Sequence, residues 1–412
     1  MRTARTFASA AACAAAALIP CAAAQAAPAG GVPVSAPEAI LVEPQTQDVV
    51  YARRASTRRP IASTTKLMTA LLTLERARLT DVFTAAPYSP SPAESLMGLR
   101  AGERLTVADL LRGLLIVSAN DAAVTLAVDV AGSQRRFVAL MNRRARQLGL
   151  KDTHYANPVG LDEPGNYSSA ADLVKLTLVL RQRAFFRATT NLGTATLNSG
   201  SRTRHLVNRN DLVRTVPYVN GVKTGHTNNA GYILVGSATR NGVTLVSAVL
   251  GDPSQAARDA DTLRLLRYGL SRYHRIAPVR KGAVLGSAAL KYRDERVDLV
   301  AARTVMRVAR RGERVTTTVT GAPAEIEGPM GAGTRVGTIL VHQRGRVVDR
   351  VALVTARHVA AATLGQRLGD YLGRGSTRAV LAVLALCSLY LALMWRRLVR
   401  RRNGAEGHGL AS

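Results

Sequence analysis

The stretch Ser63-Thr64-Thr65-Lys66, followed by the apolar run Leu67–Leu74, decides how this chain folds around its chemistry. A proline lies just upstream and the run itself has no Gly or Pro, so the pattern predicts a helix that begins near Ala62. Positions i and i+3 share a helix face, which would bring the Lys66 amine to the Ser63 hydroxyl. Because a serine hydroxyl is a weak nucleophile until a base removes its proton, this amine is the candidate base.

The composition of the chain supports Lys66 as the general base. Only six of the 56 basic residues are Lys, and the rest are Arg. A general base must lose its proton, which a desolvated Lys can do and an Arg cannot. A Lys in an Arg-rich chain therefore indicates a position where Arg would not serve. The six are Lys66, Lys151, Lys175, Lys223, Lys281 and Lys291.

The charge of the chain limits the kinds of partner that it can bind. Its 412 residues leave room for two domains, and its formal net charge is +29. Such a charge suits nucleic acid, but the basic residues are scattered and no basic stripe is interleaved with aromatics. We therefore expect no nucleic-acid partner and favour a protein that works outside the cytoplasm, beside anionic lipid and acidic wall polymer.

The first 26 residues are typical of a secretory signal peptide. Arg2 and Arg5 precede an apolar region, and Ala24-Gln25-Ala26 forms an A-x-A cleavage site. A lipid attached at Cys21 is the alternative. Of the three cysteines, two fall in this segment and Cys387 in the C-terminal tail, so the exported body would hold no disulfide and no cysteine-based metal site. We expect no metal and no cofactor.

The C-terminal end predicts a membrane anchor. Residues 379–395 carry no charge over 17 positions, the lower limit for a helical span, and five arginines follow within residues 396–402. Because positive charge stays cytoplasmic, we expect one pass through the cell membrane, the body of the protein outside and a basic cytoplasmic tail at 396–412. A buried core helix is the alternative, and residues 361–378 would be a helical stalk.

Between these ends the pattern predicts an α+β domain over residues 27–275. A hairpin is expected at Ile40–Val42 and Val49–Ala52, and a second at Tyr232–Thr239 and Val243–Leu250, joined by the favoured turn Asn241-Gly242. Apolar periodicity predicts further helices between and after these hairpins. Their expected ranges are 62–78, 105–116, 121–130, 137–148, 169–183 and 259–273.

A separate all-β domain is expected over residues 276–360. Short alternating segments broken by Gly predict its strands. These are 284–286, 297–300, 315–320, 336–342 and 347–355.

Two more short motifs are candidates for chemistry. Ser118-Ala119-Asn120 lies at the junction of two predicted helices, where a simple capping turn would serve equally well. Lys223-Thr224-Gly225 precedes the second hairpin and so lies on, or beside, a sheet strand. Gly225 removes a side chain where another backbone or a ligand can approach closely.

Taken in order, Ser63-x-x-Lys66, Ser118-x-Asn120 and Lys223-Thr224-Gly225 form a known triplet. The chain resembles the serine-type D-alanyl-D-alanine carboxypeptidases, the low-molecular-mass penicillin-binding proteins of bacterial cell walls. The likeness extends over nearly the whole exported chain, including Asn157-Pro-Val-Gly-Leu161 and Asn208-Arg-Asn210. It implies a β-lactamase/transpeptidase-like antiparallel sheet with helices, followed by a small all-β domain, and peptidoglycan stem peptides as substrate.

The resemblance also implies roles for the catalytic residues. Ser63 would attack the carbonyl between two D-alanines and form an acyl-enzyme, which penicillins would trap. Lys66 would take the Ser63 proton, Ser118 would pass a proton towards the leaving amine, and Asn120 would hold Lys66 and the substrate amide.

The remaining implied roles concern binding. The backbone N–H groups of Ser63 and His226 would form an oxyanion hole. Lys223, Thr224 and Gly225 would bind the free carboxylate of the terminal D-alanine. Arg209 and Arg258 would add positive charge there, although each suits a solvated surface group equally well.

Two other functions fit parts of the pattern. A β-lactamase would share the acylation steps, and Glu163-Pro164 lies where its water-activating glutamate would fall. The spacing to Asn166 is one residue too short for that motif, and the middle motif lacks Asp. A wall-binding scaffold with an idle site is the second alternative.

Overall fold

The computed structural model describes residues 31–405, of which side chains are described up to residue 400. The predicted signal peptide and residues 406–412 of the predicted tail lie outside this range. The described chain forms two compact units, one ending at His274 and the other beginning at Arg275.

The first unit is built on a five-stranded antiparallel sheet in the order β2-β1-β9-β8-β7. The two predicted hairpins are present, and Asn241 and Gly242 turn the second with positive φ angles of 51° and 76°. The strands are β1 (Glu38–Glu43), β2 (Asp48–Arg53), β7 (Val219–Thr227), β8 (Gly231–Arg240) and β9 (Val243–Asp252).

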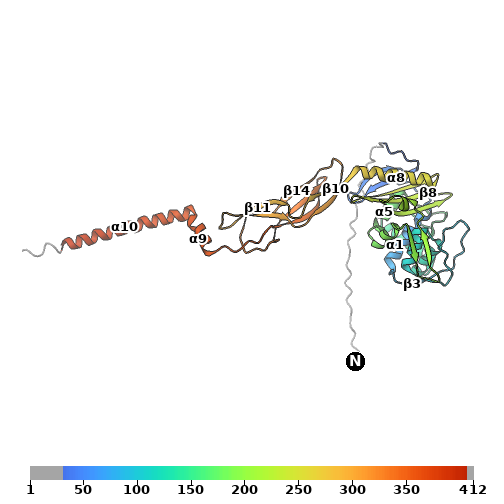
Figure 1. Cartoon of the computed structure of the whole chain (residues 1–412), viewed down its shortest axis with the longest axis horizontal. Coiled ribbons are helices and arrows are strands. Elements are labelled where there is room, and N and C mark those ends of the chain that lie inside the picture. The colour runs from blue at the N-terminus through green and yellow to red at the C-terminus, as the bar shows by residue number, and fades with distance from the viewer. Residues whose placement is uncertain (1–30, 406–412) are drawn as a thin grey trace, which may run out of the picture. The chain divides into compact units, whose positions relative to one another are not determined.

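Helices cover both faces of this sheet (Figure 1). Alternate side chains of a strand point to opposite faces. Ile40 and Val42 of β1 accordingly join the core beneath α1 and α5, whereas Ala39 and Leu41 join the core beneath α8. Both alternating sets are apolar because both faces are buried. The bounds are α1 (Lys66–Arg76), α5 (Ala170–Leu180) and α8 (Gln255–Arg272).

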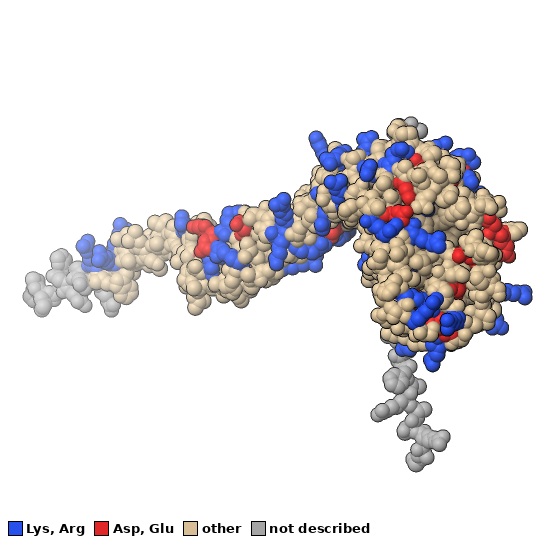
Figure 2. Space-filling view, turned by 45° about the vertical axis from the view of Figure 1, so that its right-hand side comes forward, with Lys and Arg blue, Asp and Glu red and all other residues tan. Residues whose placement is uncertain are grey.

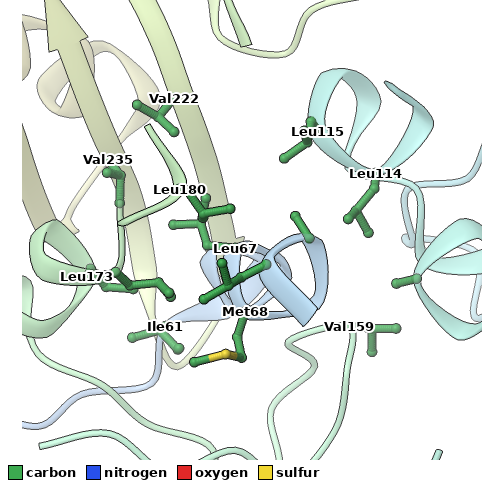
Figure 3. Close-up of a cluster of buried hydrophobic side chains, with 14 of the residues drawn as sticks. Ile61, Leu67, Met68, Leu114, Leu115, Val159, Leu173, Leu180, Val222 and Val235 are labelled. Carbon is green, nitrogen blue, oxygen red and sulfur yellow. The ribbon is translucent and has the colours of Figure 1, made fainter. Parts of the chain in front are cut away.

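The side chains of α1 fix the turn that carries Ser63 to the core of the first unit. Leu67 and Met68 are fully buried and lie among apolar side chains from the sheet, from α5 and from the segment before Ser118 (Figure 3). The other elements of this unit are α2 (Val107–Arg112), α3 (Asn120–Ala131), α4 (Gln134–Gln147), α6 (Ala184–Thr190), α7 (Asp211–Thr215) and the hairpins β3 (Val82–Thr84) with β4 (Arg104–Thr106) and β5 (Thr194–Leu197) with β6 (Arg204–Val207).

Five of the predicted helices are wrong in detail. The helices expected at 137–148 and 259–273 begin three and four residues earlier, as α4 and α8. The range 105–116 is a strand end, the short helix α2 and a π-helical turn at Gly113–Val117. The helix expected from residue 62 begins with a 3₁₀ turn at Ala62–Thr65 and becomes α-helical only at Lys66. The range 169–183 ends at Leu180, and α6 follows after a turn. Periodicity identifies the apolar face but does not report these tertiary constraints.

The second unit is β-rich. A six-stranded sheet in the order β14-β16-β17-β12-β11-β15 is accompanied by a β10–β13 pair, and β11 pairs with β15 in parallel. All five predicted strands are present, whereas β10, β13 and β15 were not predicted. The strands are β10 (Tyr273–Val279), β11 (Val284–Leu290), β12 (Arg296–Ala301), β13 (Val305–Arg310), β14 (Val315–Thr320), β15 (Glu325–Ile326), β16 (Arg335–Gln343) and β17 (Arg346–Thr355).

The predicted α+β fold followed by a β-rich unit is therefore confirmed. Two helices follow it, α9 (Leu364–Gly373) and α10 (Gly375–Ala405). Residues Gly375–Arg400 of α10 are long and apolar enough to cross a membrane, and the predicted span lies inside them. The expected stalk helix is shorter than predicted, because Arg374 adopts an extended conformation between α9 and α10.

Candidate active site

The Ser63 hydroxyl and the Lys66 amine meet at the start of α1. Lys66 Nζ donates to Ser63 Oγ at 2.9 Å and to the Val159 carbonyl oxygen at 2.5 Å. The Lys66 side chain is fully buried, while Ser63 is half-buried and reaches the surface. The predicted approach of base to nucleophile is thus present, even though the turn carrying Ser63 is 3₁₀ and not α-helical.

The environment of Lys66 favours the neutral amine. Burial lowers the pKa of Lys66 from 10.5 to about 7, because the charged form loses its hydration. The negative charges of Glu94 and Asp121 oppose this shift, and the positive charge of Arg209 adds to it. A large fraction of Lys66 is therefore unprotonated near neutral pH, as a general base requires.

Two glycines allow the Ser63 turn to be packed on both sides. Ala62 has a left-handed backbone with φ of 46°. A Cβ at Gly160 would lie 2.0 Å from the Ala62 carbonyl oxygen, and a Cβ at Gly225 would lie 3.3 Å from the Ser63 nitrogen. A side chain at Gly160 would overlap the turn that carries Ser63, and one at Gly225 would crowd that turn.

Ser118 and Asn120 follow the π-helical turn. Ser118 adopts a left-handed φ of 66°, and its side chain is only 3% exposed. Its Oγ has no hydrogen-bond partner within the described chain. Asn120 Nδ2 donates to Glu94 Oε2 at 2.6 Å. The Asn120 Oδ1 atom is buried and unpartnered among the described residues.

The Lys223 motif lies on β7, an edge strand that packs against the 3₁₀ turn of Ser63. Lys223 is buried, and its Nζ donates to the neighbouring Thr224 carbonyl oxygen at 2.9 Å. Burial holds the pKa of Lys223 well below its usual value, helped by the charges of Lys66, Arg209 and Arg258. Lys223 has no ion-pair partner among the described residues, and a bound carboxylate would favour its charged form.

The two candidate arginines differ in their surroundings. Arg209 is exposed and makes no side-chain hydrogen bond or ion pair with any described residue, but its charge lowers the pKa of both Lys66 and Lys223. Arg258 is only 3% exposed and donates from Nε and Nη2 to Asp259 Oδ1. It acts on Lys223 from within α8. Arg209 is free to bind an anion, whereas Arg258 is already paired.

His226 and Glu163 lie at the edges of this region. The His226 ring packs on Tyr232 with centroids 4.0 Å apart, so the end of β7 is braced by β8. Glu163 is exposed and its carboxylate accepts a hydrogen bond from Asn157 at 2.8 Å. Within the part of the chain that the structure describes, Glu163 makes no hydrogen bond or ion pair with Ser63 or Lys66.

Sequence reasoning missed three contributors. The Val159 carbonyl oxygen accepts from the Lys66 amine, and the Glu94 carboxylate accepts from the Asn120 amide. The missing side chain of Gly160 leaves room for the Ala62 carbonyl. The segment Asn157–Leu161 carried a signal only through its family resemblance. Glu94 carried none, because it lies 26 residues before Asn120 and belongs to no recognisable motif.

The fully buried Lys66 amine donates to the Ser63 hydroxyl, and the turn that carries Ser63 packs against the edge strand that carries Lys223. This arrangement defines a class of enzymes that form an acyl intermediate on a serine. Within that class, the family model for D-alanyl-D-alanine carboxypeptidases, peptidase S11, matches residues 22–254. The chain belongs to this family.

Individual relatives agree. The chain is 34% identical over 349 residues to the D-alanyl-D-alanine carboxypeptidase DacD of Escherichia coli, covering 81% of this chain and 89% of that protein. It is 30% identical to DacF of Bacillus subtilis over 76% of this chain and 83% of the relative. The crystal structure of penicillin-binding protein 6B from Escherichia coli matches with a TM-score of 0.58 and 30% identity, covering 78% of this chain and 96% of that one. The chain is a serine D-Ala-D-Ala carboxypeptidase.

Proposed function

We propose that this carboxypeptidase removes the terminal D-alanine from peptidoglycan stem pentapeptides through an acyl-enzyme on Ser63. The observation that carries the proposal is the 2.9 Å contact between Ser63 Oγ and a fully buried Lys66 amine whose pKa is about 7. At neutral pH this pair supplies both a nucleophile and a base, because a large fraction of Lys66 has already lost its proton.

The chemistry runs in two steps. Ser63 Oγ bonds to the carbonyl carbon of the penultimate D-alanine as its proton passes to Lys66. The resulting oxyanion is received by the backbone N–H groups of Ser63 and His226. The C–N bond then breaks, and the leaving D-alanine takes a proton through Ser118. Water then hydrolyses the ester, restoring Ser63.

The strand β7 would recognise the free carboxylate of the terminal D-alanine. Lys223, Thr224 and Gly225 on β7 would bind it, with exposed Arg209 as a second cation. The carboxylate would raise the depressed pKa of Lys223, so binding of substrate and protonation of Lys223 would reinforce one another. Arg258, whose guanidinium is paired with Asp259, contributes positive charge near Lys223 from α8.

The β-lactamase alternative receives less support. Its water-activating role would fall to Glu163, whose carboxylate is exposed and bound to Asn157. We therefore expect penicillin to acylate Ser63 and to leave slowly.

The test uses the full chain in detergent. Wild type should release D-alanine from a Lys-D-Ala-D-Ala peptide and should be labelled covalently by fluorescent penicillin, and Ser63→Ala should do neither. Fast steady-state turnover of penicillin without D-alanine release would instead favour the β-lactamase. An intact fold with neither activity would favour the scaffold.

We further propose that α10 anchors the enzyme as a single membrane span, with the catalytic unit outside the cytoplasm. Support comes from the apolar stretch Gly375–Arg400 and from the arginines that end it. The basic residues visible in Figure 2 are spread over the surface and form no single stripe, which suits an anionic wall environment better than a nucleic-acid groove. Protease added outside intact cells should cleave the catalytic unit, and protection of that unit would contradict the topology.

A further inference from the structure

A pocket of about 440 Å³ lies in the first unit, lined by three segments that adjoin the elements around Ser63. One segment is residues 58–60, which lead directly into the Ser63 turn. The second is the loop 162–167, which follows Gly160 and is called the pocket loop below. The third contributes Asn229, in the turn between β7 and β8. The residues of the three catalytic motifs do not line this pocket.

Hydrogen bonds attach the pocket loop to the catalytic elements. Asp162 Oδ1 accepts from the hydroxyl of Thr227, the last residue of β7, at 2.8 Å. Asn166 Nδ2 donates to Thr65 Oγ1 at 3.4 Å. The pocket loop therefore connects the end of the strand that carries Lys223 to the turn that carries Ser63.

The proposed binding of substrate gives the peptide a direction along β7. Its free carboxylate would lie at Lys223 and Thr224, and its attacked carbonyl would face Ser63 and the His226 N–H. The part of the peptide before that carbonyl then continues towards Thr227. An extended peptide advances about 3.3 Å per residue, so the residue before the two D-alanines lies about 7 Å from the terminal one. It arrives near the end of β7, where the pocket begins.

The two arginines of the pocket are already neutralised. Arg59 Nη1 lies 2.8 Å from Oε2 of the buried Glu38. Arg58 Nε lies 3.2 Å from Asp152 Oδ1, and its guanidinium lies over the ring of Tyr167, 5.3 Å from the centroid. Neither Glu38 nor Asp152 lines the pocket. These outer carboxylates therefore offset the positive charge that the arginines bring to it.

The two carboxylates of the pocket have no such counter-charge. Asp162 accepts from the Thr227 hydroxyl, and Glu163 Oε2 accepts from the Asn157 amide at 2.8 Å. Neither carboxylate forms an ion pair with a residue that the structure describes, and both residues are exposed. Hydrogen bonds from neutral groups leave the negative charge uncompensated. An ammonium group would supply both the opposite charge and further donors.

We propose that this pocket is a subsite for the residue that precedes the two D-alanines, and that Asp162 and Glu163 select a side chain ending in an ammonium group. A diamino acid such as lysine, with a point charge on a four-carbon stem, has this chemistry. Acylation of that amine removes its charge, so the pocket would discriminate against a stem whose side-chain amine is already in amide linkage. The inference rests on the proposed function, which places the peptide along β7.

The test measures kcat/KM for D-alanine release from three peptides, Nα-acetyl-X-D-Ala-D-Ala, by the full chain in detergent. X is lysine, Nε-acetyl-lysine or 6-hydroxynorleucine, which has a hydroxyl in place of the ammonium at equal length. Wild type should favour the lysine peptide over both others by about five- to tenfold, as expected of a charged hydrogen bond at an exposed site.

Two conservative variants assign this preference to the carboxylates. Glu163→Gln and Asp162→Asn each remove one charge but keep an oxygen that accepts from Asn157 or Thr227. Each should reduce the preference for lysine to about two- to threefold, and the double variant should abolish it. The kcat/KM for the 6-hydroxynorleucine peptide should stay within about twofold of wild type in all three. Asp294→Asn, at an exposed position of the second unit, is the control for a change in net charge and should keep the full preference.

Two results would overturn the inference: equal cleavage of the three peptides by wild type, or a double variant that still prefers lysine. Thermal unfolding of each variant reports loss of fold separately. If a variant at Asp162 does not fold, Glu163→Gln alone decides, because the Glu163 carboxylate accepts only from Asn157 among the described residues. Failure of the proposed function is distinguishable, because wild type would then release D-alanine from none of the three peptides.

Discussion

The amine of Lys66 lies 2.9 Å from the hydroxyl oxygen of Ser63, and the same amine is held at 2.5 Å by the carbonyl oxygen of Val159. The contact with Ser63 places the amine beside the hydroxyl proton that it would remove. The contact with Val159 keeps the long Lys66 side chain in this position. Because burial brings the pKa of this amine to about 7, the pair is ready to react before any substrate arrives.

Lys66→Arg should abolish acylation although it keeps the positive charge. A guanidinium does not lose its proton at any accessible pH, so the rate of labelling by fluorescent penicillin should fall by about a hundred- to ten-thousandfold. Lys175→Arg is the control, since Lys175 is exposed on α5 and its side chain bonds, among the described residues, only to the Gly149 carbonyl oxygen. Retention of labelling by Lys66→Arg would show that another group takes the Ser63 proton.

Arg209→Ala should weaken binding of the peptide more than it slows the chemistry. Its exposed guanidinium has no described partner and is available to a carboxylate. A hydrogen bond to a charged group contributes about 1.5–3 kcal/mol, so KM for the peptide should rise about 10- to 100-fold while kcat changes little. Arg146→Ala on α4, also exposed, should leave both constants unchanged. An unaltered KM in Arg209→Ala would remove this residue from the carboxylate site.

Gly160→Ala should damage both stability and activity, because the new Cβ would lie 2.0 Å from the Ala62 carbonyl oxygen. Gly102→Ala is the matched control: its φ of 82° resembles the 89° of Gly160, but nothing lies within 4 Å of its Cβ. Backbone strain alone should cost Gly102→Ala about 1–2 kcal/mol. The overlap should raise the cost for Gly160→Ala to about 3 kcal/mol or more and displace Ser63. Equal losses of unfolding free energy in the two variants would contradict the close approach.

Much of this architecture could be predicted from the residues alone. Asn241-Gly242 identified its hairpin because few other pairs accept two positive φ angles, and the alternation of apolar residues identified β8 and β9. The triplet of motifs identified the chemistry. Ser63, Lys66 and Lys223 are recognisable because catalysis restricts the residue types that can occupy those positions.

The remainder depends on contacts between distant parts of the chain. The left-handed Ala62 lies against Gly160, and the π-helical turn before Ser118 contacts α1 and β7. No local periodicity encodes these contacts. Side-chain contacts are likewise visible only in the folded structure. Examples are the ion pair of Arg258 with Asp259 and the hydrogen bond from Asn120 to Glu94. Sequence spacing suggested Arg258 as a free cation, and its ion pair makes it a supporting one.

The most direct test of the central claim is the pH dependence of Ser63 acylation. The second-order rate of penicillin labelling would be measured between pH 5 and pH 9 on the wild-type full chain, within the range where the fold stays intact. If neutral Lys66 is the base, the rate should fall about tenfold per pH unit on the acidic side, with a midpoint near the Lys66 pKa of about 7. A rate that stays flat to pH 5, or one that still rises tenfold per pH unit up to pH 9, as an amine with the ordinary lysine value of 10.5 would require, would contradict the account.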